Sequence, residues 1–154
     1  MRIGPPRMRP LGVSEVRQTA RRTKYYSKEP IFREGDQGDE MYVIKSGRVV
    51  ITKNMYGIMV KIAELGAGDH FGEMALLEGT PRSAFALADT PVELEVYDHD
   101  ALMERIAGDP EFAFAMLRAM SHRLRQIDER LTDLVAKGRL PKEEAWRISG
   151  HGMS

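Results

Sequence analysis

The sequence contains no cysteine and a single tryptophan in 154 residues. Without cysteine there is neither a disulfide framework nor thiol chemistry, which suits a reducing compartment, so we expect a cytoplasmic protein. No apolar run reaches the length of a membrane span, and the first residues lack the apolar stretch of a signal peptide. With 42% hydrophobic residues the chain can bury one core without metals or disulfides, which predicts a single compact domain.

Net charge is also absent, because 23 Lys and Arg residues balance 23 Asp and Glu residues. A neutral chain gives no general argument for nucleic acid or an anionic membrane as a partner. The basic residues are nevertheless concentrated near the start, where eight of them accompany one acid, Glu15, between Met1 and Lys28. We expect them on the solvent face of an N-terminal helix that packs on its own acidic domain. A basic arm that contacts nucleic acid is the alternative.

Turn and cap signals divide the chain into three predicted regions. These are a flexible segment over residues 1–12, a domain over 13–137 and a short tail over 138–154. The domain starts with a helix from about Ser14, a good N-cap, to about Lys24. Short strands separated by Gly-containing turns are predicted over residues 41–45, 48–52, 58–65, 83–88 and 92–97.

The last of these predicted strands has an alternating pattern. Val92, Leu94 and Val96 alternate with polar residues, which predicts one buried face. Many short strands joined by Gly-containing turns and rimmed by helices indicate an α+β fold. Its predicted form is a jelly-roll-like antiparallel β-barrel flanked by helices, with a long C-terminal helix.

The C-terminal part of the domain predicts a short helix over 100–107 and then a long one. Asp109 as N-cap and Pro110 at the first helical position start the long helix, and Gly138 ends it after about Lys137. At 1.5 Å per residue this helix is about 40 Å long. Apolar residues recur along it at spacings of three and four, as Leu117, Met120, Leu124, Ile127, Leu131 and Leu134.

This apolar seam has two interpretations. It can lie on the chain's own barrel, which would explain its first turns. Beyond Leu124 we expect it to pair with the same helix of a second copy, giving a homodimer.

The segment FGEMALLEGTPRSA, residues 71–84, is the most informative motif. Gly72 and Glu73 open a single predicted helical turn over 73–77, whose first backbone N–H groups are available to an anion. A Gly-Thr-Pro break follows, and Arg82 then enters a new strand with a planar, charged fork suited to two phosphate oxygens. A phosphate held there leaves its sugar beside Glu73, whose carboxylate can accept a hydrogen bond from a ribose hydroxyl.

This motif resembles the phosphate-binding cassette of the cyclic nucleotide-binding domain family. Upstream, the segment FREGDQGDEMYVIKSGRVVIT, residues 32–52, resembles that family's first paired strands. The similarity spans about Lys28 to Leu134, and it implies the jelly-roll-like fold and a cyclic mononucleotide ligand.

The resemblance also implies roles for individual residues. Glu73 takes the ribose 2′-hydroxyl, and Arg82 holds the exocyclic phosphate oxygens. The other implied contacts are the backbone N–H groups of Gly72, Met74 and Ala75, the Ser83 hydroxyl on phosphate or purine, and Ala84 near the base. Because the last helix of such domains commonly covers the purine, Asp128 is a candidate acceptor for the exocyclic amine of adenine, although guanine N–H groups would serve equally. Rival contacts on that helix are Arg123, Arg125 and Gln126.

Enzymatic chemistry finds little support in the sequence. His70 and Glu73 form an H-x-x-E pair, but a catalytic metal needs about three protein ligands and the other histidines do not fall on facing strands. No nucleophile and base stand out, and there is no Gly-x-Ser-x-Gly motif. We therefore expect no metal site, no cofactor and no catalysis.

The sequence thus predicts a non-catalytic sensor that binds cAMP in preference to cGMP and signals through movement of its C-terminal helix. Related transcription factors place a helix-turn-helix after that helix, and the 20 residues after Leu134 are too few for one, so no DNA-binding domain is expected. The output then passes to an unknown effector protein, for which Trp146 is a candidate docking residue or an anchor on the domain. The alternative is a ligand-free dimerisation or docking module with the same fold.

Overall fold

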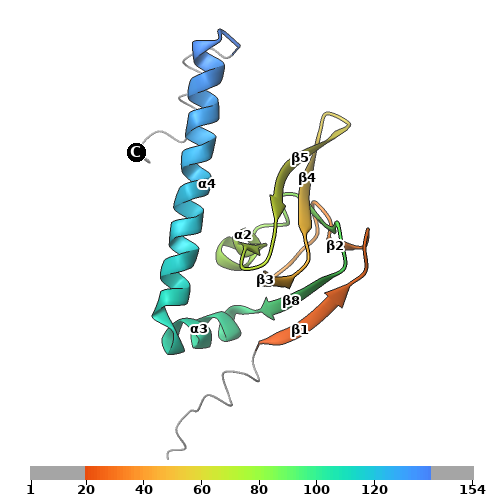
Figure 1. Cartoon of the computed structure of the whole chain (residues 1–154), viewed down its shortest axis with the longest axis vertical. Helices are drawn as coiled ribbons and strands as arrows, with labels where there is room; N and C mark the ends of the chain where they lie inside the picture. The colour runs from red at the N-terminus through yellow and green to blue at the C-terminus, as the bar shows by residue number, and fades with distance from the viewer. Residues whose placement is uncertain (1–19, 140–154) are drawn as a thin grey trace, which may run out of the picture. The chain divides into compact units, whose positions relative to one another are not determined.

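The computed structural model describes residues 20–139. Its strands are β1 (Arg21–Tyr25), β2 (Pro30–Phe32), β3 (Met41–Ser46), β4 (Val49–Met55), β5 (Ile58–Leu65), β6 (His70–Phe71), β7 (Phe85–Ala88) and β8 (Val92–Tyr97). Its helices are α2 (Glu73–Glu78), α3 (His99–Gly108) and α4 (Pro110–Ala136), as labelled in Figure 1. The chain divides into two compact units, the first ending at Asp109 and the second beginning at Pro110. Over the described residues, no helix is long and apolar enough to cross a membrane.

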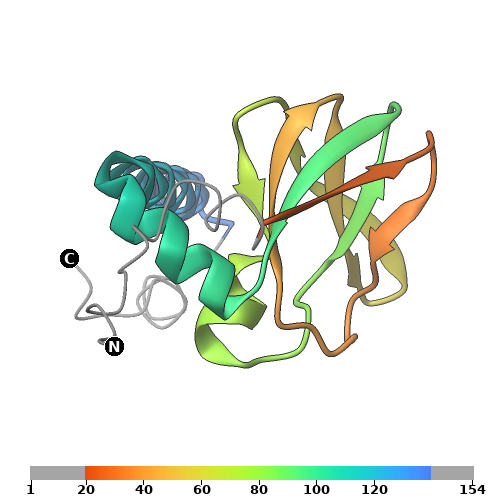
Figure 2. The ribbon, with the colours of Figure 1, turned by 90° about the horizontal axis from the view of Figure 1, so that it is seen from below.

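The strands form two four-stranded antiparallel sheets, with the orders β1-β8-β3-β6 and β2-β7-β4-β5 (Figure 2). Each sheet places strands from the two ends of the β region side by side, so that β1 pairs with β8 and β2 with β7. This nesting of early and late strands is the jelly-roll arrangement. The predicted α+β jelly-roll-like fold is confirmed, and the pairings of the described strands leave its two sheets as separate layers.

The hydrophobic core lies on the inward faces of the two sheets. The alternation predicted for residues 92–97 is confirmed, because Val92, Leu94 and Val96 are each at most 3% exposed. Both sheets contribute to this core, the first with residues such as Ile44 of β3 and the second with residues such as Val49 of β4. The strands predicted over 58–65 and 92–97 have the observed bounds, while that predicted over 83–88 begins two residues later.

The predicted N-terminal helix is wrong where it can be checked. Residues 21–25 form β1 and pair with β8 in a continuous ladder from Arg21↔Val96 to Tyr25↔Val92. Thr23 and Tyr25 alternate with more exposed residues, as a half-buried strand requires. The ladder to β8 is a long-range interaction that local propensity does not reveal. The earlier part of that predicted helix, and the predicted segment 1–12, lie outside the described residues.

Two basic residues of β1 have acidic partners on their own domain. Arg21 Nη1 lies 2.6 Å from Glu40 Oε2, and Arg22 Nη1 lies 3.3 Å from Glu93 Oε2. Both arginine side chains remain 60% exposed, so each ion pair adds little stability. Both arginines are exposed and have acidic partners on the same domain, but they lie on a strand and not on the predicted helix.

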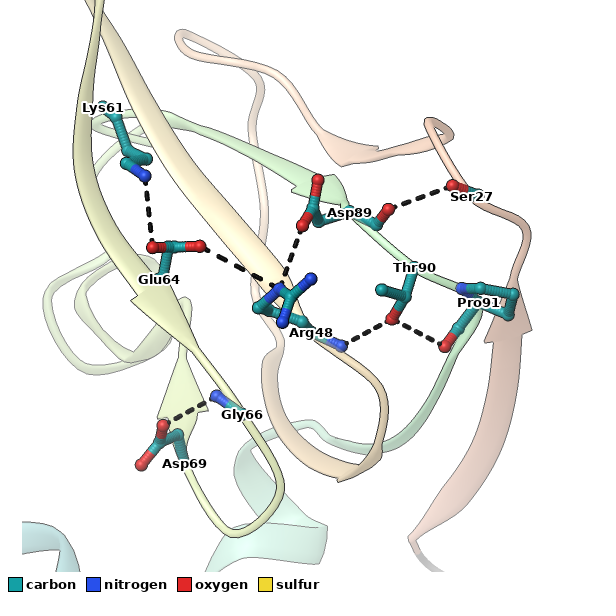
Figure 3. Close-up of polar contacts among 9 residues, drawn as sticks. All are labelled: Ser27, Arg48, Lys61, Glu64, Gly66, Asp69, Asp89, Thr90 and Pro91. Carbon is teal, nitrogen blue, oxygen red and sulfur yellow. Dashed lines mark hydrogen bonds and ion pairs between the residues drawn. The ribbon is translucent and has the colours of Figure 1, made fainter.

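Polar contacts fix one end of the second sheet (Figure 3). Arg48, immediately before β4, donates from Nε to Asp89 Oδ2 at 2.9 Å and from its backbone N–H to Thr90 Oγ1 at 2.9 Å. Glu64 of β5 lies 3.9 Å from the same Nε. The turn between β7 and β8 is thereby held against the hairpin of β4 and β5.

The ends of α4 follow the predicted signals, and Pro110 is its first residue. The cap of α3 was not predicted: the Asp98 carboxylate accepts from the backbone N–H of Ala101 at 2.8 Å, and α3 begins at His99 instead of residue 100. At the far end of α4, Gly138 has φ 70°, and the Arg139 N–H donates to the Leu134 carbonyl oxygen. This Schellman arrangement ends α4 at the predicted glycine.

Along α4, the seam residues Leu117, Leu124 and Ile127 are 48 to 64% exposed. An apolar seam with such exposure is compatible with a paired helix, and the predicted homodimer remains a prediction. The predicted tail and Trp146 lie outside the described residues.

Candidate functional site

Arg82 occupies the loop between α2 and β7, and its backbone is tied to the loop that follows β2. Its N–H donates to the Asp36 carbonyl oxygen at 2.8 Å, and its own carbonyl oxygen accepts from the Gly35 N–H at 2.8 Å. The residue is only 5% exposed. Two backbone hydrogen bonds therefore fix the origin of a buried arginine side chain.

The guanidinium of Arg82 packs against aromatic rings. Its Cζ lies 4.2 Å from the centroid of the Phe32 ring and 5.7 Å from that of Tyr42, both within the range of cation–π attraction. Its Nη1 donates to the Gly72 carbonyl oxygen at 3.0 Å. Gly72 and Arg82 were both predicted from the motif, and this hydrogen bond brings them together.

The two rings belong to an aromatic cluster supplied by three different strands. Phe32, Tyr42 and Phe71 come from β2, β3 and β6, and their ring centroids are 5.1 to 5.9 Å apart. Burial raises the pKa of Tyr42, and the positive charge of Arg82 opposes that rise. Sequence reasoning missed this cluster as part of the site, because no local spacing links Phe32 to Arg82.

Two glycines leave room for the guanidinium. A Cβ atom on Gly38 would lie 2.5 Å from Arg82 Cζ, and one on Gly72 would lie 2.9 Å from Arg82 Nη1. Gly72 also has φ 81°, a conformation that favours glycine. The sequence analysis assigned no role to Gly38, although this residue lies in segment 32–52, which resembles the first paired strands of the family.

Arg82 is a buried cation, and no carboxylate in the described part of the chain pairs with its charge. Among residues 20–139, no acidic side chain lies within ion-pair distance of its guanidinium. Burying an unpaired charge is costly, so such a group normally belongs with a counter-ion. A guanidinium carries five N–H donors in a fixed fork, and phosphate is the anion that this fork fits best.

Glu73 is the other buried charged residue of the motif. It is the first residue of α2 and 6% exposed, and its Oε1 lies 3.1 Å from His70 Nε2. These are the two residues of the H-x-x-E pair in the sequence, and the structure brings their side chains together. The N-cap residue of α2 is Gly72, which has no side chain to cap the first N–H groups of the helix.

The remaining predicted contacts differ in exposure. Ala75 and Ala84 are 4% and 8% exposed, whereas Met74 is 49% exposed. The Ser83 hydroxyl is on an exposed residue and lies 4.0 Å from the Met74 sulfur. Asp128 is exposed on α4, in the second compact unit, where its backbone carbonyl accepts from Thr132 Oγ1 at 2.8 Å.

Metal chemistry has no visible site in the part of the chain that the structure describes. No group of three or more His, Asp or Glu side chains there is arranged to hold a metal ion. The arrangement around Arg82 is suited to binding an anion by hydrogen bonds and charge.

Comparison with known proteins places this site in a family. The sequence model of the cyclic nucleotide-binding domain matches residues 22–109, which include the aromatic cluster, α2 and Arg82. The match covers more than half of the chain, and the chain belongs to the cyclic nucleotide-binding domain family. Such domains are regulatory.

Individual relatives agree with this assignment. A CRP-like cAMP-activated global transcriptional regulator of Mycobacterium tuberculosis is 35% identical over 117 residues, which are 73% of this chain and 52% of that protein. A cGMP-dependent protein kinase of Eimeria tenella is 36% identical over 109 residues, 70% of this chain and 10% of the kinase. The chain thus spans about half the length of the first relative and a small part of the second.

A solved structure gives the same result for the fold. The crystal structure of a cyclic nucleotide-binding domain from Methylobacillus flagellatus superposes with a TM-score of 0.63 and 29% sequence identity. The match covers 71% of this chain and 64% of that chain.

Proposed function

We propose that this protein is a non-catalytic sensor that binds a cyclic mononucleotide, with cAMP preferred over cGMP. The observation that carries the proposal is Arg82, a buried guanidinium that packs on Phe32 and has no carboxylate partner among the described residues. A cyclic phosphate carries one negative charge and two exocyclic oxygens, which match the charge and the fork of this side chain. Arg82 therefore holds the phosphate.

The other ligand contacts follow from the motif and the family. Glu73 accepts a hydrogen bond from the ribose 2′-hydroxyl. The remaining contacts are backbone N–H groups of Gly72, Met74 and Ala75, the Ser83 hydroxyl, and Ala84 beside the base. A nucleotide of about 22 heavy atoms at about 0.3 kcal/mol each gives about 7 kcal/mol, an affinity in the low-micromolar to tens-of-micromolar range.

The base preference and the output involve the C-terminal helix. Asp128 of α4 accepts a hydrogen bond from the exocyclic amine of adenine, and movement of α4 carries the signal to an effector protein. The cAMP-activated mycobacterial relative supports adenine, while the cGMP-dependent kinase relative supports testing both bases. The sensor unit comprises residues 13–137 and acts as a cytoplasmic homodimer.

The test is calorimetric titration of nucleotide-stripped protein with cAMP and with cGMP. We expect micromolar binding with cAMP tighter, no measurable binding to Arg82→Ala, and weakened binding to Arg82→Lys, which keeps the charge and loses the fork. Circular dichroism of each variant checks that it is folded. Equal dissociation constants for wild type and Arg82→Ala would remove the phosphate assignment.

A second candidate is a ligand-free dimerisation or docking module. It is favoured by the apolar side chains that α4 leaves exposed, among them Phe114, Leu117 and Leu124. Absence of heat from either nucleotide, in protein demonstrated to be folded and empty, would support this candidate. Ligand binding that depends on Arg82 would argue against it.

A further inference from the structure

The outer part of the β4–β5 hairpin exposes a continuous apolar surface. β4 pairs with β7 from Val49 to Thr52, whereas its pairing with β5 continues to Met55. Residues 53–60 therefore extend beyond the four-stranded part of the sheet as a two-stranded ribbon (Figure 1). Together with Lys61 and Ile62 at its base, we call this ribbon the hairpin tip, residues 53–62. The exposed apolar side chains of the hairpin tip are Met55, Tyr56, Ile58, Met59, Val60 and Ile62.

These apolar side chains lie on both faces of the ribbon. Met55 pairs with Ile58, so their side chains share one face, and Val60 follows on that face two residues later. Met59 lies between them in the strand and therefore points to the opposite face. A flat protein surface covers one face of such a ribbon, whereas an apolar medium into which the hairpin tip inserts covers both faces and the end.

The turn at the end of the hairpin tip carries a tyrosine in an uncommon backbone conformation. Tyr56 and Gly57 have φ 55° and 87°, and the Gly57 N–H donates to Asn54 Oδ1 at 2.8 Å. A two-residue turn with positive φ at both positions favours Asn-Gly, and a bulky residue is rare at the first position. The Tyr56 side chain is also fully exposed, so packing within the domain does not account for it. Tyrosine is enriched where a membrane meets water, because its ring is apolar and its hydroxyl is polar.

Basic side chains flank the apolar surface. The hairpin tip contains Lys53 and Lys61 and neither Asp nor Glu. Lys61 Nζ lies 3.1 Å from Glu64 Oε2, but the two side chains are 57% and 49% exposed, so this ion pair is weak. A lysine lays its alkyl stem along an apolar surface and keeps its ammonium group in a polar layer, where anionic lipid headgroups attract it.

We propose that the hairpin tip docks on an anionic lipid bilayer, with Tyr56 and its apolar neighbours at the boundary of the acyl chains and with Lys53 and Lys61 at the headgroup phosphates. Exposure on both faces of the ribbon favours a bilayer over a second copy of the chain as the occupant. The proposed nucleotide contacts lie outside residues 53–62, so membrane docking is a property additional to nucleotide binding.

The experiment is co-sedimentation of the full chain with vesicles of phosphatidylcholine alone and of phosphatidylcholine mixed with phosphatidylglycerol. We expect wild type to bind the mixed vesicles about tenfold or more tightly than the neutral ones, since each lysine near an anionic surface contributes about fivefold. Lys53→Gln with Lys61→Gln should remove most of this preference. Tyr56→Asn with Ile58→Thr should weaken binding to the mixed vesicles about tenfold or more, because it removes apolar surface that the bilayer covers.

The variants are chosen to keep the fold. Asparagine is favoured at the positive φ of residue 56, and threonine is favoured in strands, so Tyr56→Asn with Ile58→Thr should retain the stability of wild type. Urea unfolding checks this, and the affinity for cAMP should be unchanged. The matched control is Tyr26→Asn, which removes another tyrosine, 80% exposed, outside the hairpin tip and should leave vesicle binding unchanged.

A fluorescence measurement places the hairpin tip directly. The chain has a single tryptophan, so Trp146→Phe combined with Tyr56→Trp leaves one tryptophan, at the turn. Its emission should shift to shorter wavelength on addition of the mixed vesicles and be quenched by brominated acyl chains. Trp146→Phe with Tyr26→Trp is the control and should show neither change.

Four outcomes would overturn the proposal. They are failure of folded wild type to bind the mixed vesicles, unchanged binding in folded Tyr56→Asn with Ile58→Thr, an unchanged lipid preference after loss of both lysines, and a tryptophan at position 56 that does not respond to vesicles. If Tyr56→Asn with Ile58→Thr instead converts an oligomer to monomers by light scattering, in a protein that does not bind vesicles, the hairpin tip contacts a second copy and the bilayer is the wrong occupant.

Discussion

The guanidinium of Arg82 lies over the ring of Phe32, with Cζ 4.2 Å from the ring centroid. The two residues are 50 positions apart, and backbone hydrogen bonds of Arg82 to Gly35 and Asp36 bring their segments together. The ring offers a buried cation some of the electrostatic stabilisation that it loses with its hydration. One N–H of the guanidinium donates to the Gly72 carbonyl oxygen, and the donors that this bond and the ring leave unused are suited to an anionic ligand.

This relationship predicts the effect of removing the Phe32 ring. Phe32→Leu keeps apolar volume but removes the cation–π attraction, so we expect the dissociation constant for cAMP to rise about 3- to 30-fold, corresponding to about 0.5 to 2 kcal/mol. Tyr42→Phe is the matched control, because it keeps the second ring and loses only a hydroxyl group. Calorimetry measures both, and similar affinities for Phe32→Leu and wild type would contradict a role for the ring.

Gly38 predicts a second, purely steric effect. In Gly38→Ala the new Cβ would lie 2.5 Å from Arg82 Cζ, so the side chain of Arg82 must move. Since a flexible side chain can yield, we expect the fold to survive and cAMP affinity to fall about tenfold or more. Gly66→Ala is the control, because nothing lies within 4 Å of its added Cβ. Unfolding midpoints in urea separate loss of affinity from loss of stability, and an unchanged affinity in Gly38→Ala would refute the steric argument.

The sequence could predict those parts of the site that are local. Gly72 and Arg82 lie in one short segment, and their hydrogen bond joins residues that the motif already placed together. The hairpin of β4 and β5 could also be predicted, because Gly57 marks a turn between two runs of strand-forming residues. In the structure Tyr56 and Gly57 have positive φ in that turn.

The parts that the sequence did not predict depend on long-range pairing. β1 was interpreted as helix because its ladder partner, β8, lies about 70 residues away. The two-residue strand β6 is too short for a periodic pattern, yet its pairing with β3 places both Phe71 and His70. Phe32 and Gly38 lie beside Arg82 because β2 pairs with β7 and because Arg82 makes backbone hydrogen bonds to Gly35 and Asp36.

Tyr97 predicts how stability changes in alkaline solution. Burial first, and then a hydrogen bond from its hydroxyl to Glu95 Oε1, raise the pKa of Tyr97 from 10.0 to about 12. A phenol with a raised folded-state pKa contributes stability fully present below the unfolded-state pKa, and this contribution is lost as pH rises through the folded-state value. The free energy of unfolding should therefore decrease between pH 10 and about 12, in part through Tyr97.

The matching variant is Tyr97→Phe, which keeps the ring and removes the ionisable group. We expect it to be less stable than wild type below pH 10, because the half-buried Glu95 and Arg105 lose a hydrogen-bond partner. The difference should become smaller above pH 10, where wild type loses the Tyr97 contribution. Urea unfolding at a series of pH values measures both effects. A stability difference that stays constant with pH would contradict the raised pKa.

The exposed seam of α4 predicts the oligomeric state. Leu124 is 49% exposed and Leu131 lies one heptad further, so both would face a partner helix in a parallel pair. We expect wild type to be dimeric by light scattering and Leu124→Asp with Leu131→Asp to be monomeric, because carboxylates cannot be buried unpaired in an apolar seam. Gln126→Asp with Arg130→Asp adds the same number of carboxylates at exposed positions off the seam and should remain dimeric. If wild type stays monomeric at high concentration, with and without cAMP, the predicted homodimer is wrong.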